Sequence, residues 1–90
     1  MLLAPIATSP PFPAGADLDD RGAAAFVVAL RMVVAINFLG LPAVAVPAGP
    51  GGGLPQAVQL VGGRFAEAQC LQAAEDVERR LGRPVPIEPR

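Results

Sequence analysis

The chain has 90 residues, of which 52% are hydrophobic, and its formal net charge is −1. This length allows at most one small domain, and a near-neutral charge with scattered arginines argues against a nucleic-acid partner. The sequence contains no His and no Lys, and Thr8, Ser9 and Cys70 are each the sole residue of their type, so a Ser–His–Asp, Cys–His or Ser–Lys catalytic group cannot be assembled from it.

A lone cysteine also excludes an intrachain disulfide and a Cys/His zinc cluster. We interpret Cys70 as a small buried hydrophobic residue, because no His or Lys is available to activate its thiol. The sequence therefore predicts no catalytic residue, no metal site and no cofactor. Residues 1–16 lack the basic leader of a signal peptide, and we expect a cytoplasmic location.

The N-terminal part is predicted to form a short strand and then a loop. Leu2–Ala7 is apolar, and the prolines at positions 10, 11 and 13 remove backbone donors and block a helix. Asp17–Asp20 follows as a helix entry, because an Asp oxygen can cap free amides at the positive end of a helix.

The next apolar segment, at about 22–36, predicts a mostly buried helix. It is rich in alanine and longer than a usual strand. Arg31 interrupts it, and a membrane span would place this charge near its middle, so we expect no membrane insertion. A membrane-bound helix is the third alternative for the chain. Asn37 and Gly40, which both tolerate a left-handed backbone, are expected to end the helix.

A first apolar strand is predicted at Ala43–Val46. Pro42 keeps the preceding backbone extended, and Pro47 is expected to end the strand. Ala48–Gly53 is predicted to be a flexible turn, because no Lys or Ser follows its glycines as a phosphate-binding loop would require.

A second strand is predicted at Ala57–Val61 and a second helix at about 66–81. The helix carries an apolar stripe at spacings of three and four, formed by Cys70, Leu71, Ala74, Val77 and Leu81. Glu75–Arg79 and Asp76–Arg80 are expected to pair on its exposed side. Gly82 and Pro84 stop it, and residues 83–90 are predicted to be a tail.

These elements indicate an α/β piece with two to three short strands and two main helices. Strands that are apolar on both faces are typical of sheet centres covered on both sides, and so few strands are marginal alone. We therefore predict that residues 1–90 form a single partial domain, with more apolar surface than the chain can bury itself.

Eight fixed positions carry a resemblance to a known family. They are Asn37, Gly40, Pro42, Pro47, Gly49, Pro55, Gln59 and Gly62. In this order and spacing they resemble the C-terminal portion of the amidase signature family, over about the whole chain. The resemblance implies a piece of that family's mixed-sheet fold. It also implies hydrolysis of carboxylic amides by a Ser–Ser–Lys triad, whose residues precede this region in the family and have no counterpart here.

The leading hypothesis is a C-terminal fragment of an amidase-signature hydrolase that is inactive alone. Its partner would be a complementary N-terminal amidase segment or a second copy of the chain. The alternative is a small non-catalytic α/β module that docks through exposed apolar strands. We expect the eight motif residues to be structural, with Asn37 capping a helix end and Gln59 satisfying buried backbone groups. The other interpretation is that the side-chain amides of Asn37 and Gln59 contact the substrate.

Overall fold

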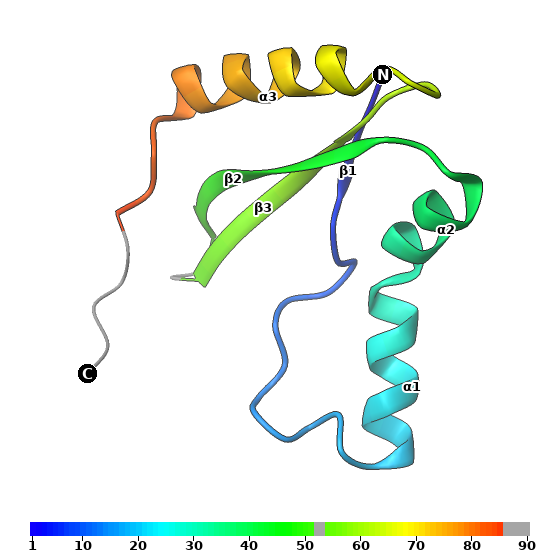
Figure 1. Ribbon diagram of the computed structural model, residues 1–90. Coiled ribbons are helices and arrows are strands. Elements are labelled where there is room, and N and C mark those ends of the chain that lie inside the picture. Colours follow the sequence, from blue (N-terminus) through cyan, green and yellow to red (C-terminus); the bar gives the residue numbers. More distant parts are fainter. Residues whose placement is uncertain (52–53, 86–90) are drawn as a thin grey trace.

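The computed structural model describes residues 1–51 and 54–85. Within them, three strands form an antiparallel sheet and three helices accompany it, as Figure 1 shows. The strands are β1 (Leu2–Pro5), β2 (Ala43–Gly51) and β3 (Leu54–Val61), and the helices are α1 (Asp20–Ala29), α2 (Arg31–Leu39) and α3 (Glu67–Leu81). The predicted α/β class is confirmed. Gly52 and Gly53 of the predicted turn and residues 86–90 of the predicted tail lie outside the described residues.

Strand β3 lies at the centre of the sheet, between β1 and β2. Val61 pairs with Leu2 on one side and with Ala43 on the other, so the N-terminus and the middle of the chain meet on one strand (Figure 1). Of the two strands that the sequence predicts to be central, only β3 is flanked on both sides. Strand β2 is an edge strand.

Pro47 does not end β2, contrary to the prediction. The strand continues to Gly51, and Pro47 pairs with Ala57 of β3. An edge strand tolerates a residue without an N–H group, and the register shifts between Pro47 and Gly49. Gly49 has a φ angle of 93°, which a bulge can require and glycine permits. Residues 48–51 are therefore strand rather than turn.

The helix predicted at about 22–36 is divided into α1 and α2, which meet at an angle of 57°. The break follows from the carbonyl oxygen of Ala29, which accepts the backbone N–H of Thr8 at 2.9 Å. A loop donor inserted at this point interrupts the helical hydrogen-bond ladder. The guanidinium of Arg31 donates to the carbonyl of Val28 at 3.0 Å and helps to close the end of α1.

The ends of the helix pair match the local signals in the sequence. The backbone N–H of Gly22 donates to the Asp19 carboxylate at 2.7 Å. At the other end, Gly40 has a φ angle of 68° and its N–H donates to the carbonyl of Asn37. Asp19 is therefore the N-cap that the acidic cluster predicts, and Gly40 is the left-handed C-cap.

Replacing Asp19 with alanine is expected to lower the free energy of unfolding by about 1 kcal/mol, because the Gly22 N–H then loses its acceptor. Asp19→Asn retains a side-chain oxygen and serves as the control. Urea unfolding followed by far-ultraviolet circular dichroism measures both variants. Equal unfolding midpoints for the alanine and asparagine variants would contradict a capping role.

Helix α3 covers one face of the sheet and forms the main core. Val46, Leu60 and Ala74 are buried together, with Val44, Ala73 and Val77 packed around them. Cys70 is 2% exposed, in agreement with its predicted burial. Two members of the predicted stripe, Leu71 and Leu81, are instead exposed.

The exposed side of α3 carries the ion pairs. Arg79 lies 3.4 Å from Glu75, as predicted, and also 3.5 Å from Asp76. The predicted Asp76–Arg80 pair is therefore wrong, since Arg79 reaches both acids. Such exposed pairs contribute little to stability.

The chain leaves much of its apolar surface uncovered. Its accessible surface is 7034 Å², whereas a compact domain of this mass exposes about 4900 Å². The segment predicted to be a mostly buried helix is largely exposed, with only Ala29 and Ile36 buried in α1 and α2. On α2, Val34 is exposed and Phe38 is 90% exposed.

In the described part of the chain, no single helix has the length and apolar character of a membrane span. The bent α1–α2 pair meets these two criteria only when its helices are taken together.

Candidate functional site

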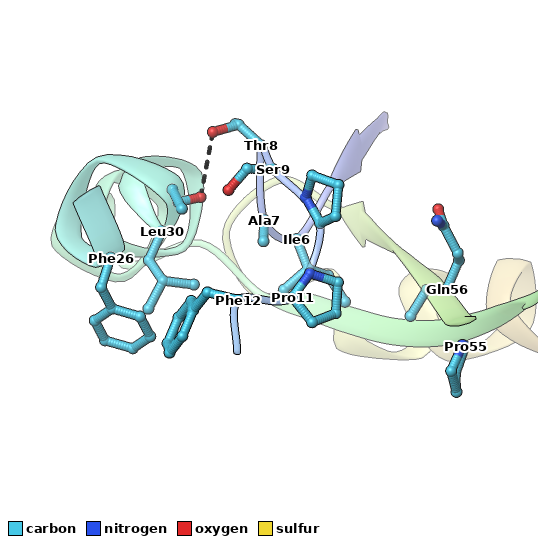
Figure 2. Close-up of a pocket in the computed structure, with 13 residues that line it drawn as sticks. Ile6, Ala7, Thr8, Ser9, Pro11, Phe12, Phe26, Leu30, Pro55 and Gln56 are labelled. Atoms are coloured by element: carbon cyan, nitrogen blue, oxygen red, sulfur yellow. Dashed lines mark hydrogen bonds between the residues drawn. The ribbon is translucent and has the colours of Figure 1, made fainter. Parts of the chain in front are cut away.

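A hollow of about 480 Å³ lies between the loop after β1, helix α1 and the start of β3. Figure 2 shows the rings of Phe12 and Phe26 together on one side of it, and Pro55 and Gln56 on the other. Ile6 and Leu30 add aliphatic surface to its wall. The hollow exists because the Thr8–Ala29 hydrogen bond ties the proline-rich loop to α1.

The polar groups in this hollow are few and carry no charge. The Thr8 hydroxyl lies 3.5 Å from the Ala29 carbonyl, to which it donates, and the Ser9 hydroxyl also faces the hollow (Figure 2). Serine becomes a nucleophile only with an adjacent base, and the sequence supplies neither His nor Lys. This arrangement can bind a ligand, but it cannot activate Ser9 for attack.

A second hollow, of about 420 Å³, lies between α2 and the face of the sheet opposite α3. Asn37 and Gln59, the two amides identified in the sequence, both line it. Gln59 is 5% exposed and its side-chain N–H donates to the carbonyl of Pro5 at 2.9 Å. Asn37 is exposed in the last turn of α2, and its backbone carbonyl accepts the Gly40 N–H.

Three further residues, two of them motif positions, meet where β2 begins and β3 ends. The carbonyl of Pro42 accepts the N–H of Gly62 at 3.0 Å, and the thiol of Cys70 donates to the same oxygen at 3.9 Å. A Cβ atom on Gly62 would lie 2.6 Å from the Cys70 sulfur. The strand pair and the first turn of α3 therefore approach closely only because residue 62 is glycine.

The remaining motif residues lie near the far end of the strand pair. Pro47 and Gly49 flank the register shift in β2, and Pro55 opposes Pro50 across the pair. Pro55 also lines the first hollow. Gly40 is the C-cap of α2, and the other motif residues lie at the second hollow, at the Pro42–Gly62 junction and at the bulged end of the sheet. The eight residues are thus not brought to one common site.

The sequence does not identify Phe12, Phe26 or Leu30 as residues of a hollow. Phe12 lies in an aperiodic proline-rich loop, and the other two lie in a helix that is apolar nearly all round. The spacing of these residues carries no sign that the loop folds back on α1. The sequence does contain a Thr–Ser pair before the prolines, but such a pair occurs in many structural contexts and does not by itself indicate a hollow.

The sequence predicts no metal site and no catalytic residue. In residues 1–51 and 54–85, no three His, Cys, Asp or Glu side chains lie close enough together to hold a metal ion. In the same ranges, every buried side-chain nitrogen or oxygen has a hydrogen-bond partner.

Comparison with known proteins identifies the family. The family model described as Amidase matches residues 1–71. The chain is 44% identical over 80 residues to a glutamyl-tRNA(Gln) amidotransferase chain of Synechococcus sp. (strain CC9902), a match that covers 88% of this chain and 16% of that protein. It is 43% identical over 63 residues to indoleacetamide hydrolase of Bradyrhizobium japonicum, covering 70% of this chain and 14% of the hydrolase.

A shorter match, 56% identical over 46 residues, covers 50% of this chain and 10% of the corresponding glutamyl-tRNA(Gln) amidotransferase chain of Neisseria meningitidis. No solved structure matches the chain. The chain spans about one-sixth of the length of the curated relatives or less. A family match over most of its length, which includes all eight motif positions, establishes that the chain belongs to the amidase family.

Proposed function

We propose that this chain is the C-terminal portion of an amidase-signature hydrolase and that it is inactive alone. One observation carries the proposal: the family match extends over residues 1–71, yet the sequence contains no lysine. The resemblance implies that a lysine-assisted serine relays a proton while a second serine attacks the amide carbon. Backbone amides would stabilise the resulting oxyanion, and the amine would leave as the C–N bond breaks.

The proposed partner is a complementary N-terminal amidase segment. The exposed apolar side chains of α2 support it, because Val34 and Phe38 offer surface that a larger domain would bury. Residues 1–90 would then be a single partial domain, with the motif residues in structural positions such as the Gln59–Pro5 hydrogen bond. A cytoplasmic location is part of the proposal, because a lone buried thiol requires no oxidising compartment.

The first experiment incubates the purified chain with acetamide, benzamide and indole-3-acetamide and measures released ammonia. We expect no release above a blank without protein. Any release by the isolated chain is measured again with a Ser9→Ala variant. Release that persists in this variant comes from a contaminating enzyme. Release that disappears with Ser9→Ala would contradict the proposed inactivity.

The second experiment supplies the proposed partner, an N-terminal amidase segment. Indoleacetamide hydrolase of Bradyrhizobium japonicum, shortened by the region that matches this chain, is co-expressed with the 90-residue chain. We expect a stable complex that hydrolyses indole-3-acetamide, and a Phe38→Asp chain to reduce its formation. The Leu18→Asp chain, altered at an exposed position of the loop before α1, is the control. No complex with the shortened hydrolase, together with a stable complex with an unrelated protein, would instead favour the small interaction module.

A further inference from the structure

We propose that two copies of the chain associate through the outward face of α1, with the two helices antiparallel. This inference goes beyond the proposed function, because it concerns the chain alone and a different helix from α2. The chain has surface to spare for such a contact. It exposes about 2100 Å² more than a compact domain of its mass, whereas a standard interface buries about 800 Å² on each partner.

One side of α1 is open to a partner. The helix stands apart from the sheet in Figure 1, with the proline-rich loop along one side of it. Gly22, Phe26 and Ala29 lie against this loop. On the opposite side of the helix, Val27 is 62% exposed and Val28 is 57% exposed. The outward face of α1 therefore presents branched apolar side chains that the chain itself does not cover.

The outward face carries charges of opposite sign at its two ends. Asp20, Ala24, Val27 and Arg31 follow one another at spacings of four, three and four, which places them in one row along a helix. Arg31 is the first residue of α2, but its guanidinium donates to the Val28 carbonyl at 3.0 Å and thus stays at the end of α1. All four residues of the row are exposed. Within residues 1–51 and 54–85, neither charge has an ion-pair partner.

This row is complementary to itself in an antiparallel pair. Asp20 and Arg31 lie equally far from the midpoint of the row, between positions 25 and 26, and so do Ala24 and Val27. A twofold axis through that midpoint places each aspartate opposite the arginine of the second copy, and each valine opposite the small alanine. The contact of a large with a small side chain allows the usual separation of helix axes, about 8–10 Å. A parallel pair would place like charges together, which is unfavourable.

The test measures the mass of the purified 90-residue chain by sedimentation equilibrium at increasing protein concentration. We expect a monomer–dimer equilibrium. Asp20→Arg and Arg31→Glu should each weaken dimerisation about tenfold, because each turns both ion pairs of the dimer into like-charge contacts. The matched controls are Glu67→Arg and Arg80→Glu, which make the same changes in the first and last turns of α3 and should leave dimerisation unchanged.

A mixture of the two α1 variants separates lost pairing from lost folding. In a dimer of one Asp20→Arg copy with one Arg31→Glu copy, every charge at positions 20 and 31 again faces its opposite. The mixture should therefore dimerise about as tightly as the original chain, although each variant alone dimerises weakly. Damage to the fold of either variant would not be repaired by mixing.

Three results would overturn the proposal: a chain that stays monomeric at millimolar concentration, equal weakening by the α1 and α3 variants, or a mixture that dimerises no better than its components. Circular dichroism shows whether each variant folds. If a charge reversal unfolds α1, Val27→Asp replaces it, and unchanged dimerisation of this variant would equally overturn the proposal. None of these measurements requires hydrolysis or the N-terminal segment, so their outcome is independent of the ammonia assays.

Discussion

Replacing Gly22 with alanine is expected to destabilise α1 by about 2–3 kcal/mol, the range of severe overpacking, although alanine is the better helix former by about 1 kcal/mol. A Cβ atom on residue 22 would overlap the backbone carbonyl of Ala16. The clash is with main-chain atoms, so no side-chain rotation relieves it. The loop would have to move away from the helix, which would also disturb the Asp19 cap.

Far-ultraviolet circular dichroism and the urea midpoint measure this effect. The control is Gly63→Ala, because a Cβ atom there meets no atom within 4 Å and its φ angle is not positive. We expect the control to change the free energy of unfolding by less than about 0.5 kcal/mol, as for most surface substitutions. A Gly22→Ala chain as stable as the Gly63→Ala chain would show that the loop does not rest against α1.

Gly62→Ala is expected to lower the free energy of unfolding by about 1–3 kcal/mol, through overpacking against the Cys70 sulfur. The distance of 2.6 Å from an ideal Cβ atom to that sulfur is too short for van der Waals contact. Gly62 is buried, and its N–H is held by the Pro42 carbonyl at 3.0 Å. Moving Gly62 away would stretch this hydrogen bond, and Cys70 is only 2% exposed, so its sulfur has little space into which to turn.

A double-mutant cycle isolates the contact. Cys70→Ala removes the sulfur, so Gly62→Ala should cost much less in that background than in the original chain. We expect a coupling free energy of about 1 kcal/mol or more between the two positions, within the range for residues in contact. Independent, additive effects in urea unfolding would contradict the assigned close approach.

Local signals in the sequence predict the ends of elements well. The Asp cluster before α1 gives the N-cap Asp19, and Gly40 provides the left-handed C-cap of α2. The helix expected at about 66–81 begins at Glu67 and ends at Leu81. Each of these features depends on residues within one or two turns of the chain, which a sequence displays directly.

Features that depend on distant contacts were not predictable in this way. The break between α1 and α2 requires Thr8, 21 positions before Ala29 in the chain. The continuation of β2 through Pro47 depends on its place at the edge of the sheet. No periodicity or propensity encodes either fact, because both depend on which segments lie side by side.

The two hollows also differ in how far the sequence indicates them. The second one contains Asn37 and Gln59, the polar residues that stand out in otherwise apolar elements. The first one is formed by a loop and a helix that no motif relates, and of the motif residues only Pro55 lines it. A polar residue in an apolar run is a visible signal, whereas a contact between Phe12 and Phe26 becomes visible only in the fold.

The two outer strands of the sheet each contain a proline, Pro5 in β1 and Pro47 in β2. Proline offers no amide hydrogen to an incoming strand, and such residues at a border discourage fibrillar stacking. Contact with other molecules is thereby directed from the rims of the sheet to its broad sides. A chain with so much exposed apolar surface is in this way protected against amyloid growth at the edges of its sheet.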